Sequence, residues 1–322
     1  MAKAALLLIA GLMLLEPAVA RSQGYPARPI RFIVPIAAGS GPDLTARLLA
    51  PDLARQMGQQ VVVDNRPGAS SVIGMELVAR SAPDGYTIGY GPATILAVVP
   101  SLLGKMPYDT DRDLQMVVHL GDTPNLLVVS TSLPVKSVRE LIDYAKANPG
   151  KLSYGSPGIG TSQHLSGELF KKMTGTQIVH VPYKGVQEAI TDVIGARVQL
   201  AFPNVAPVLP HVKAGRVRGL AVTSPKRSVV IPELPTIAEA GVPGYELTTW
   251  AGVVVPAGVP KAIVARLNAE FNKALAGPAF REKYLAQGNE PVGGTVDDFA
   301  RFVKKERVKW ASFIKDAEIK PE

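Results

Sequence analysis

The stretch Ile30-Arg31-Phe32-Ile33-Val34-Pro35-Ile36-Ala37-Ala38-Gly39-Ser40-Gly41-Pro42-Asp43 decides the fold. Its start is an apolar run typical of a buried strand, and residues 43–57 carry apolar side chains at helical spacing. The glycines and prolines between these two segments are typical of a turn. Strand, loop and helix in this order predict the first unit of an α/β protein. Pro51 lies inside the predicted helix and would remove one of its hydrogen bonds, so we expect a kink or a break there.

The same alternation continues along the rest of the chain. Further strands are predicted at residues 60–63, 87–90, 125–130, 152–154, 178–181, 198–202, 218–223 and 252–255, and further helices at 72–81, 138–147, 162–173, 186–194, 261–276 and 296–317. A segment rich in proline and glycine, residues 225–244, interrupts this series and reads as a connector. The chain is also too long for one ordinary domain. The sequence therefore predicts a bilobed α/β fold in which two α/β domains enclose a ligand cleft.

The composition excludes several functional classes. The chain has 322 residues, of which 47% are hydrophobic and 6% aromatic, which suits a globular core and excludes a disordered tail or a multi-pass membrane protein. It has no cysteine, so disulfides, cysteine-ligated metals and thiol nucleophiles are excluded. It has only four histidines, so few nitrogen ligands are available for a transition metal. We therefore expect neither a metal nor a cofactor.

The N-terminus has the layout of a secretory signal peptide. Lys3 precedes an apolar run over residues 4–15, and Ala18-Val19-Ala20 follows as a small-residue cleavage motif. As a helix, twelve residues would cover about 18 Å, which is too short to cross a bilayer as an anchor. We predict that residues 1–20 are removed by cleavage near Ala20 and that the mature protein is soluble and exported.

The net charge of +8 comes from scattered Lys and Arg residues. Because they lack long basic runs and interleaved aromatic residues, they indicate a solvated surface rather than a nucleic-acid footprint. We expect no nucleic-acid partner, and anionic small molecules or an acidic partner surface instead.

Two glycine-containing loops follow predicted strands and precede predicted helices: residues 35–43 and residues 155–162. Their backbone N–H groups and the N-termini of the helices that follow can bind an anion. Both loops lie at the carboxyl ends of strands, where ligands commonly bind in open α/β sheets. Ordinary turn and capping chemistry would explain the same residues structurally. Neither loop matches a phosphate-binding fingerprint, because no Gly-Lys-Ser/Thr and no complete Rossmann pattern is present.

A hydrolase is the alternative from another functional class. Ser156 or Ser162 with His164 would provide a nucleophile and a base. The chain has no Gly-x-Ser-x-Gly elbow, and no Asp partner can be nominated, so catalytic residues are not expected. Asn204 follows a predicted strand, where it would either hydrogen-bond a ligand or cap a turn.

An ordered series of short motifs carries a family resemblance. The motifs are Tyr25-Pro26 to Pro35 with its glycine loop, Val61 to Gly68, Ala82-Pro83-Asp84-Gly85-Tyr86, Gly160-Thr161-Ser162 with His164 and Leu165, His180-Val181-Pro182-Tyr183-Lys184-Gly185, Leu220-Ala221-Val222-Thr223-Ser224, Pro256-Ala257-Gly258 and Glu290-Pro291-Val292-Gly293-Gly294-Thr295. Through them essentially the whole mature chain resembles the exported Bug-type substrate-binding proteins, the solute receptors of tripartite tricarboxylate transporters. The resemblance implies a periplasmic-binding-protein (Venus-flytrap) fold, with one lobe at residues 24–124 plus about 225–322 and the other at about 125–224.

The resemblance also implies a function and a set of site residues. The protein would capture a small organic carboxylate (a di- or tricarboxylate or an aromatic acid) and deliver it, as a monomer, to membrane permease subunits; a receptor for a membrane sensor is the alternative use of the same cleft. The residues that match the family's ligand loops are Ile36, Gly39, Ser40, Asp43, Thr94, Ser156, Gly160, Thr161, Ser162, His164 and Asn204. Ile36 stands where the family commonly has Phe, and Pro203 where it frequently has an acidic residue, which favours simple organic acids over amino acids as ligands.

Overall fold

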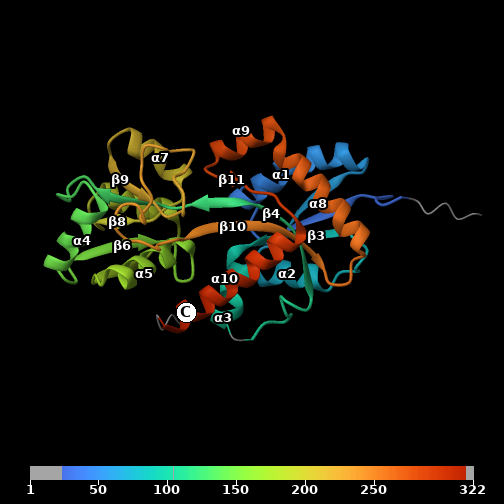
Figure 1. The fold of residues 1–322 in the computed structure, drawn as a ribbon, viewed down its shortest axis with the longest axis horizontal. Coiled ribbons are helices and arrows are strands. Elements are labelled where there is room, and N and C mark those ends of the chain that lie inside the picture. The colour runs from blue at the N-terminus through green and yellow to red at the C-terminus, as the bar shows by residue number, and fades with distance from the viewer. Residues whose placement is uncertain (1–23, 104, 317–322) are drawn as a thin grey trace, which may run out of the picture.

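The computed structural model describes residues 24–103 and 105–316 and has two lobes, each built on its own β-sheet (Figure 1). The predicted signal peptide lies outside the described residues. We call the lobe with the six-stranded sheet lobe 1 and the lobe with the five-stranded sheet lobe 2. The bilobed α/β fold expected from the sequence is confirmed. Within the described ranges, no helix combines the length and the apolar character needed to cross a membrane.

The sheet of lobe 1 has the strand order β11-β4-β10-β3-β1-β2. Its strands are β1 (Ile30–Val34), β2 (Val61–Asn65), β3 (Thr87–Pro92), β4 (Leu114–Pro124), β10 (Thr248–Pro256) and β11 (Glu290–Pro291). Strand β1 pairs in parallel with β2 and β3, whereas β10 pairs antiparallel with β3 and β4. The loop after β1 and the turn after β3 therefore lie at the same edge of the sheet.

The sheet of lobe 2 has the order β7-β6-β8-β5-β9. Its strands are β5 (Leu126–Ser130), β6 (Leu152–Ser156), β7 (Ile178–Pro182), β8 (Leu200–Ala201) and β9 (Val217–Val222). Strand β6 is parallel to β7 and β8, so its carboxyl end, followed by the second glycine loop, is an edge where ligands favour binding.

Helices cover the sheets and surround the region between the lobes. They are α1 (Gly41–Met57), α2 (Val72–Ala79), α3 (Val99–Leu103), α4 (Val138–Ala147), α5 (Ser162–Thr174), α6 (Val186–Ile194), α7 (Val205–Lys213), α8 (Lys261–Ala276), α9 (Pro278–Ala286) and α10 (Val296–Asp316), with a 3-10 turn at Ala69–Ser71 and a π-helical turn at Thr94–Val98. In lobe 1, β1 and β3 pack with α1 and α8 in a buried apolar cluster. Figure 1 shows β4 and β10 lying along the middle of the molecule, toward lobe 2.

Of the kink or break expected at Pro51, the break is wrong, because α1 continues through Pro51 to Met57, and a kink stays a prediction. Leu49 and Leu53, on either side of the proline, are fully buried in the core of lobe 1. Packing of this apolar face outweighs the loss of one helical hydrogen bond.

The chain passes between the lobes at Asn125, which joins β4 to β5 and is fully buried. Its N–H donates to Oγ1 of Thr223 (2.9 Å), and the N–H of Thr223 donates back to the Asn125 carbonyl (2.9 Å). The Thr223 carbonyl accepts in turn from the N–H of Leu247 (2.9 Å), which directly precedes β10. Asn125, Thr223 and Leu247 are therefore hydrogen-bonded in series where the chain passes between the lobes.

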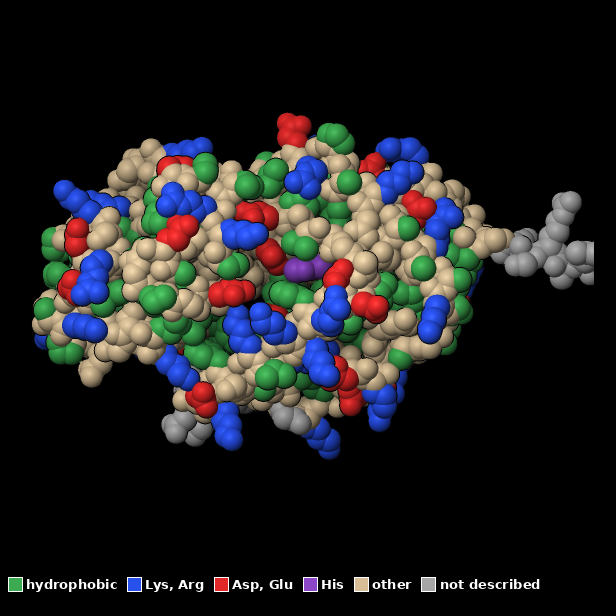
Figure 2. Space-filling view, viewed as in Figure 1, with side chains coloured by type: hydrophobic (Ala, Val, Ile, Leu, Met, Phe, Trp, Pro, Cys, Tyr) green, Lys and Arg blue, Asp and Glu red, His purple; other side chains and the backbone are tan. Residues whose placement is uncertain are grey.

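Charged side chains are dispersed over the surface. Figure 2 shows Lys and Arg interspersed with Asp and Glu on the visible face. Ion pairs occur among the exposed charged residues of the described chain, such as Arg227 with Glu239 (2.8 Å). The visible face therefore matches the solvated surface expected from the sequence.

Candidate ligand site between the lobes

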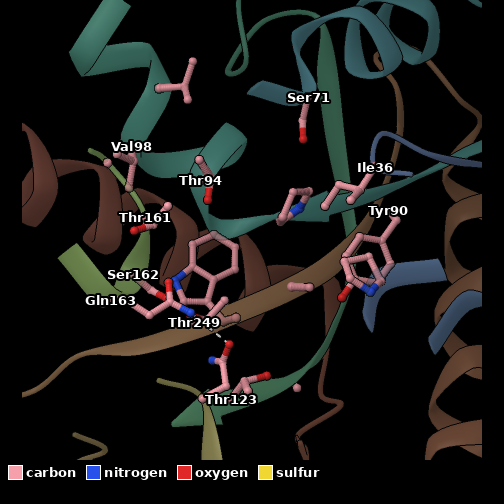
Figure 3. A pocket seen from close by; sticks show the side chains of 18 of the residues that line it. Ile36, Ser71, Tyr90, Thr94, Val98, Thr123, Thr161, Ser162, Gln163 and Thr249 are labelled. Carbon is pink, nitrogen blue, oxygen red and sulfur yellow. Dashed lines mark hydrogen bonds between the residues drawn. The ribbon is translucent and has the colours of Figure 1, made fainter. Parts of the chain in front are cut away.

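A cavity of about 380 Å³ lies between the two lobes. Lobe 1 contributes the loop after β1, the turn after β3 and the start of β10, and lobe 2 contributes the loop before α5. In Figure 3, Thr161, Ser162 and Gln163 lie on one side of the cavity, and Ile36 and Tyr90 lie on the opposite side. A ligand held here would contact both lobes at once.

The described cavity lining contains no charged side chain. Its polar groups are hydroxyls and amides from Ser71, Tyr90, Thr94, Thr123, Thr161, Ser162, Gln163, Asn204, Thr249 and Tyr284, and its apolar wall includes Ile36, Val98, Val99, Leu102, Ile159 and Trp250. An anion would thus be held by neutral donors and helix dipoles rather than by an ion pair.

The second glycine loop is held in one conformation by its own hydrogen bonds. Thr161 is the N-cap of α5: its Oγ1 donates to the Gly158 carbonyl (2.7 Å) and accepts from the His164 N–H (3.3 Å). Gly160 has a φ of 79°, a conformation that favours glycine. The first turn of α5 has unpaired N–H groups, and Thr161 and Ser162 at its start line the cavity. This geometry is a preformed anion site.

His164 and Ser156 support this loop from behind, and neither lines the cavity. Nδ1 of His164 accepts from the Gly160 N–H (3.3 Å), and Oγ of the fully buried Ser156 lies 2.7 Å from Nε2 of His180. Burial, followed by the nearby His180, lowers the pKa of His164 to about 4. His164 is therefore neutral at physiological pH, which leaves Nδ1 free to accept a hydrogen bond.

The lowered pKa of His164 predicts that stability falls on acidification. In the unfolded chain His164 binds a proton near pH 6.5, whereas in the folded protein it does so only near pH 4. Between these values the unfolded state holds more protons, so the free energy of unfolding is expected to decrease as the pH falls from 6.5 to 4. The free energy of unfolding can be measured with denaturant at several pH values in this range. Its change per pH unit should be larger for the wild type than for His164→Gln. Equal slopes would contradict this assignment.

The first glycine loop is arranged differently. Ile36 and Pro42 line the cavity, but Gly39, Ser40 and Asp43 do not. Burial would raise the pKa of the Asp43 carboxyl, but hydrogen bonds from the Arg47 side chain and the Gly39 N–H (2.9 Å) hold it below its ordinary value. Asp43 therefore stabilises the loop.

Of the eleven residues that the sequence nominated, the structure brings six together around the cavity: Ile36, Thr94, Gly160, Thr161, Ser162 and Asn204. The other five, Gly39, Ser40, Asp43, Ser156 and His164, are outside the cavity lining. Oγ of Ser40 is buried with no hydrogen-bond partner among the described residues. Direct ligand contact remains a prediction for all eleven.

The π-helical turn after β3 carries Thr94 and Val98 into the cavity wall. Such turns are frequent at functional sites. Arg307 of α10 holds the turn from its far side, since its Nε donates to the Leu96 carbonyl (2.6 Å) while its guanidinium also pairs with Asp111.

Several lining residues escaped the sequence analysis. Thr123 and Thr249 face each other across β4 and β10, in positions that were not recognised as strand. Oγ1 of Thr249 is buried with no hydrogen-bond partner in the described part of the chain. Ser71 has a φ of 77°, which is unusual for a residue other than glycine. Such backbone conformations occur often at functional sites. A sequence does not reveal them.

A series of amide hydrogen bonds runs from Gln163 in the cavity lining to Asn125, where the chain passes between the lobes. Nε2 of Gln163 donates to Oδ1 of Asn204 (3.0 Å), and Nδ2 of Asn204 donates to Oδ1 of Asn125 (2.9 Å). The side-chain amide of Asn204 is therefore hydrogen-bonded on both sides, to Gln163 and to Asn125.

The hydrolase alternative finds no matching geometry. Ser156 is fully buried and its histidine neighbour is His180, while the hydroxyl of Ser162 donates to Oε1 of Gln163 (3.1 Å). Nδ1 of His164 is occupied by the Gly160 N–H. A serine nucleophile must be both accessible and paired with its base, and neither candidate satisfies both conditions.

Comparison with known proteins shows the family to which the chain is similar. Residues 45–319 match the family model of the tripartite tricarboxylate transporter family receptor, TctC. Protein BugT of Bordetella pertussis is 40% identical over 293 residues, which cover 91% of this chain and 90% of BugT. A protein from the tcbD–tcbE intergenic region of Pseudomonas sp. strain P51 is 40% identical over 295 residues, covering 91% of this chain and 88% of its own.

Solved structures share the fold. The Rpa4515 protein of R. palustris with adipate superposes with a TM-score of 0.80 at 41% identity and covers 92% of this chain and 100% of its own. MatC of Rhodopseudomonas palustris with bound malate gives a TM-score of 0.74 at 27% identity, with 90% of this chain and 100% of its own covered. The periplasmic binding protein BugD gives a TM-score of 0.74 at 33% identity, with 92% and 100% covered.

Proposed function

We propose, from the premise that this chain belongs to the tripartite tricarboxylate transporter receptor family, that it is a periplasmic solute-binding protein for a small organic carboxylate. The observation that carries the proposal is the cavity between the lobes, where the N-terminus of α5 meets hydroxyls from both lobes without a charged side chain among the described lining residues. Its relatives are binding proteins, and the hydrolase alternative has no support from them.

Capture follows from contact with both lobes. A carboxylate group at Thr161 and Ser162 accepts hydrogen bonds from lobe 2, while the rest of the ligand contacts Thr94 and Tyr90 of lobe 1. Only contacts made in the closed state favour closure, so a ligand that spans the cavity shifts the lobes toward it. The closed form is then the species that membrane permease subunits would recognise, and we expect the receptor to act as a monomer.

The ligand class is a simple organic acid. The related Rpa4515 and MatC proteins were solved with adipate and malate, both dicarboxylates. The neutral lining of this cavity fits a carboxylate held by amides and hydroxyls, and in the described lining nothing acidic is available to bind the ammonium group of an amino acid.

A thermal-shift screen of the mature protein tests this function. The panel contains dicarboxylates, tricarboxylates and aromatic acids, each at increasing concentration. We expect at least one acid to raise the melting temperature with a concentration dependence that fits one site, because a ligand that binds only the folded state stabilises it. Failure of every acid to stabilise the protein would overturn the proposal.

Thr161→Ala is expected to weaken carboxylate binding about 10-fold or more while the protein stays folded. The change removes the hydroxyl that donates to the Gly158 carbonyl and caps the His164 N–H, so the loop no longer holds the α5 N-terminus preformed for the anion. Loss of the N-cap should also lower the free energy of unfolding by about 1 kcal/mol. Isothermal titration measures the dissociation constant, and Thr161→Ser, which keeps the hydroxyl, is the control. An unchanged dissociation constant in Thr161→Ala would count against this placement of the anion.

A further inference from the structure

A second cavity, of about 550 Å³, adjoins the first. We call it the second chamber; its own walls are formed by Gly41, Leu44 and Thr45 of α1, Ala206 and Pro207 of α7, and Ala286, Gln287 and Asn289 at the end of α9. The two cavities share part of their lining, namely Pro42, Tyr90, Thr123, Asn204 and Thr249. Shared walls make the second chamber a continuation of the ligand cavity.

The chemistry of the second chamber differs from that of the anion site. Leu44, Ala206, Pro207 and Ala286 give it an apolar wall, and its described lining includes no charged side chain. Polar side chains at its far end bond to one another. Oδ1 of Asn289 accepts from Oγ1 of Thr123 (2.6 Å), and Nδ2 of Asn289 donates to Oε1 of Gln287 (3.4 Å). Because these groups bond to one another and the described lining has no cation, the apolar wall favours an uncharged tail over a second carboxylate.

The junction offers one unused hydrogen-bonding group. Oγ1 of Thr249 lies on the shared wall and is buried with no hydrogen-bond partner among the described residues. A buried hydroxyl without a partner is costly, so a ligand with a carbonyl, hydroxyl or ether oxygen at the junction would gain a hydrogen bond there that a plain methylene chain would not.

We propose that the second chamber is a subsite for the distal part of the solute, so that the preferred ligand is an elongated carboxylate with an uncharged aliphatic or aromatic tail. The carboxylate lies at Thr161 and Ser162, the chain passes Thr249, and the tail lies against Leu44 and Ala286. The inference rests on the proposed function and specifies its ligand class.

The test compares unbranched monocarboxylates of increasing length by isothermal titration. Each methylene that enters the second chamber should tighten binding up to about fourfold. We expect the wild type to bind octanoate at least about tenfold more tightly than butanoate. If butanoate or a short dicarboxylate binds while octanoate gains nothing, the subsite is overturned and the proposed function stands. If no carboxylate binds, the proposed function itself fails.

Variants locate the effect. Leu44→Gln removes part of the apolar wall without changing the charge, and Ala286→Phe reduces the volume of the chamber. Both are expected to lower the preference for octanoate over butanoate at least about threefold while the butanoate dissociation constant changes less than twofold. Val308→Gln is the matched control, because Val308 is an exposed residue of α10 that lines neither cavity. An unchanged preference in both chamber variants would contradict the proposal.

Discussion

Ser162→Asp is expected to abolish carboxylate binding and to leave the fold intact. Ser162 begins α5 and lines the cavity beside Thr161. An aspartate in the first turn of a helix is favourable for the helix itself, so folding should not suffer. In the cavity, however, its charge would oppose the bound carboxylate. Two like charges about 4 Å apart repel by up to about 4 kcal/mol at a protein surface, which corresponds to a loss of up to about 1,000-fold in affinity.

The control for this experiment is Ser162→Asn, which is almost the same size as the aspartate but neutral. Isothermal titration should find binding to Ser162→Asn within about tenfold of the wild type, while Ser162→Asp gives no measurable heat. Circular dichroism and thermal unfolding establish that both variants fold. Binding of equal strength to the two variants would mean that the anion lies elsewhere.

Gly252→Ala is expected to lower the free energy of unfolding by about 3 kcal/mol. Gly252 lies in the middle of β10, where an added methyl group would overlap the ring of Phe299 and lie 2.6 Å from the Val118 carbonyl oxygen. A side chain can rotate away, but the backbone of the neighbouring strand cannot move without breaking the pairing of β4 and β10. Overpacking of this kind typically costs 1 to 3 kcal/mol, and here both neighbours are buried.

Gly195→Ala is the matched control, since a Cβ at Gly195 would lie no nearer than 3.5 Å to the Thr191 carbonyl oxygen, an ordinary contact, and its φ of -79° suits alanine. Both variants change the entropy of the unfolded chain alike, so their difference isolates the steric effect. Urea unfolding should give a lower midpoint for Gly252→Ala alone. Equal midpoints would show that the centre of the larger sheet tolerates added volume.

Most helices and strands could be predicted because their apolar residues follow a clear period. Strand β1 and helix α6 begin and end where the pattern indicates, and Ser137 caps α4 by accepting from the Glu140 N–H (3.1 Å) as expected from the capping box. Strand β4 was missed because its sequence includes His119, Gly121 and Asp122, which interrupt the apolar pattern. Helices α7 and α9 have only nine residues each, too few for a clear apolar period, and prolines within α7 obscure its spacing further.

The site was predictable where a loop directly precedes a helix, and less so elsewhere. Gly160, Thr161 and Ser162 reach the cavity because they begin α5. Ser156 ends β6 and His164 lies in the first turn of α5, close to these residues in sequence. Neighbouring side chains on a strand or a helix point in different directions. Ser156 therefore contacts His180, and His164 contacts the Gly160 N–H, outside the cavity lining. Thr249 and the walls of the second chamber come from segments far apart in the chain. Their proximity in the fold could not be predicted from a single sequence.

The most direct test of the central claim compares an acid with its uncharged analogue. The mature protein is titrated by calorimetry with adipate, the ligand of the related Rpa4515 protein, and with adipamide, which has the same carbon skeleton. If neutral donors at the α5 N-terminus hold a carboxylate between the lobes, adipate binds with one site per chain and adipamide gives no detectable heat at the same concentrations. Equal binding of the two compounds, or binding of adipamide alone, would contradict the account.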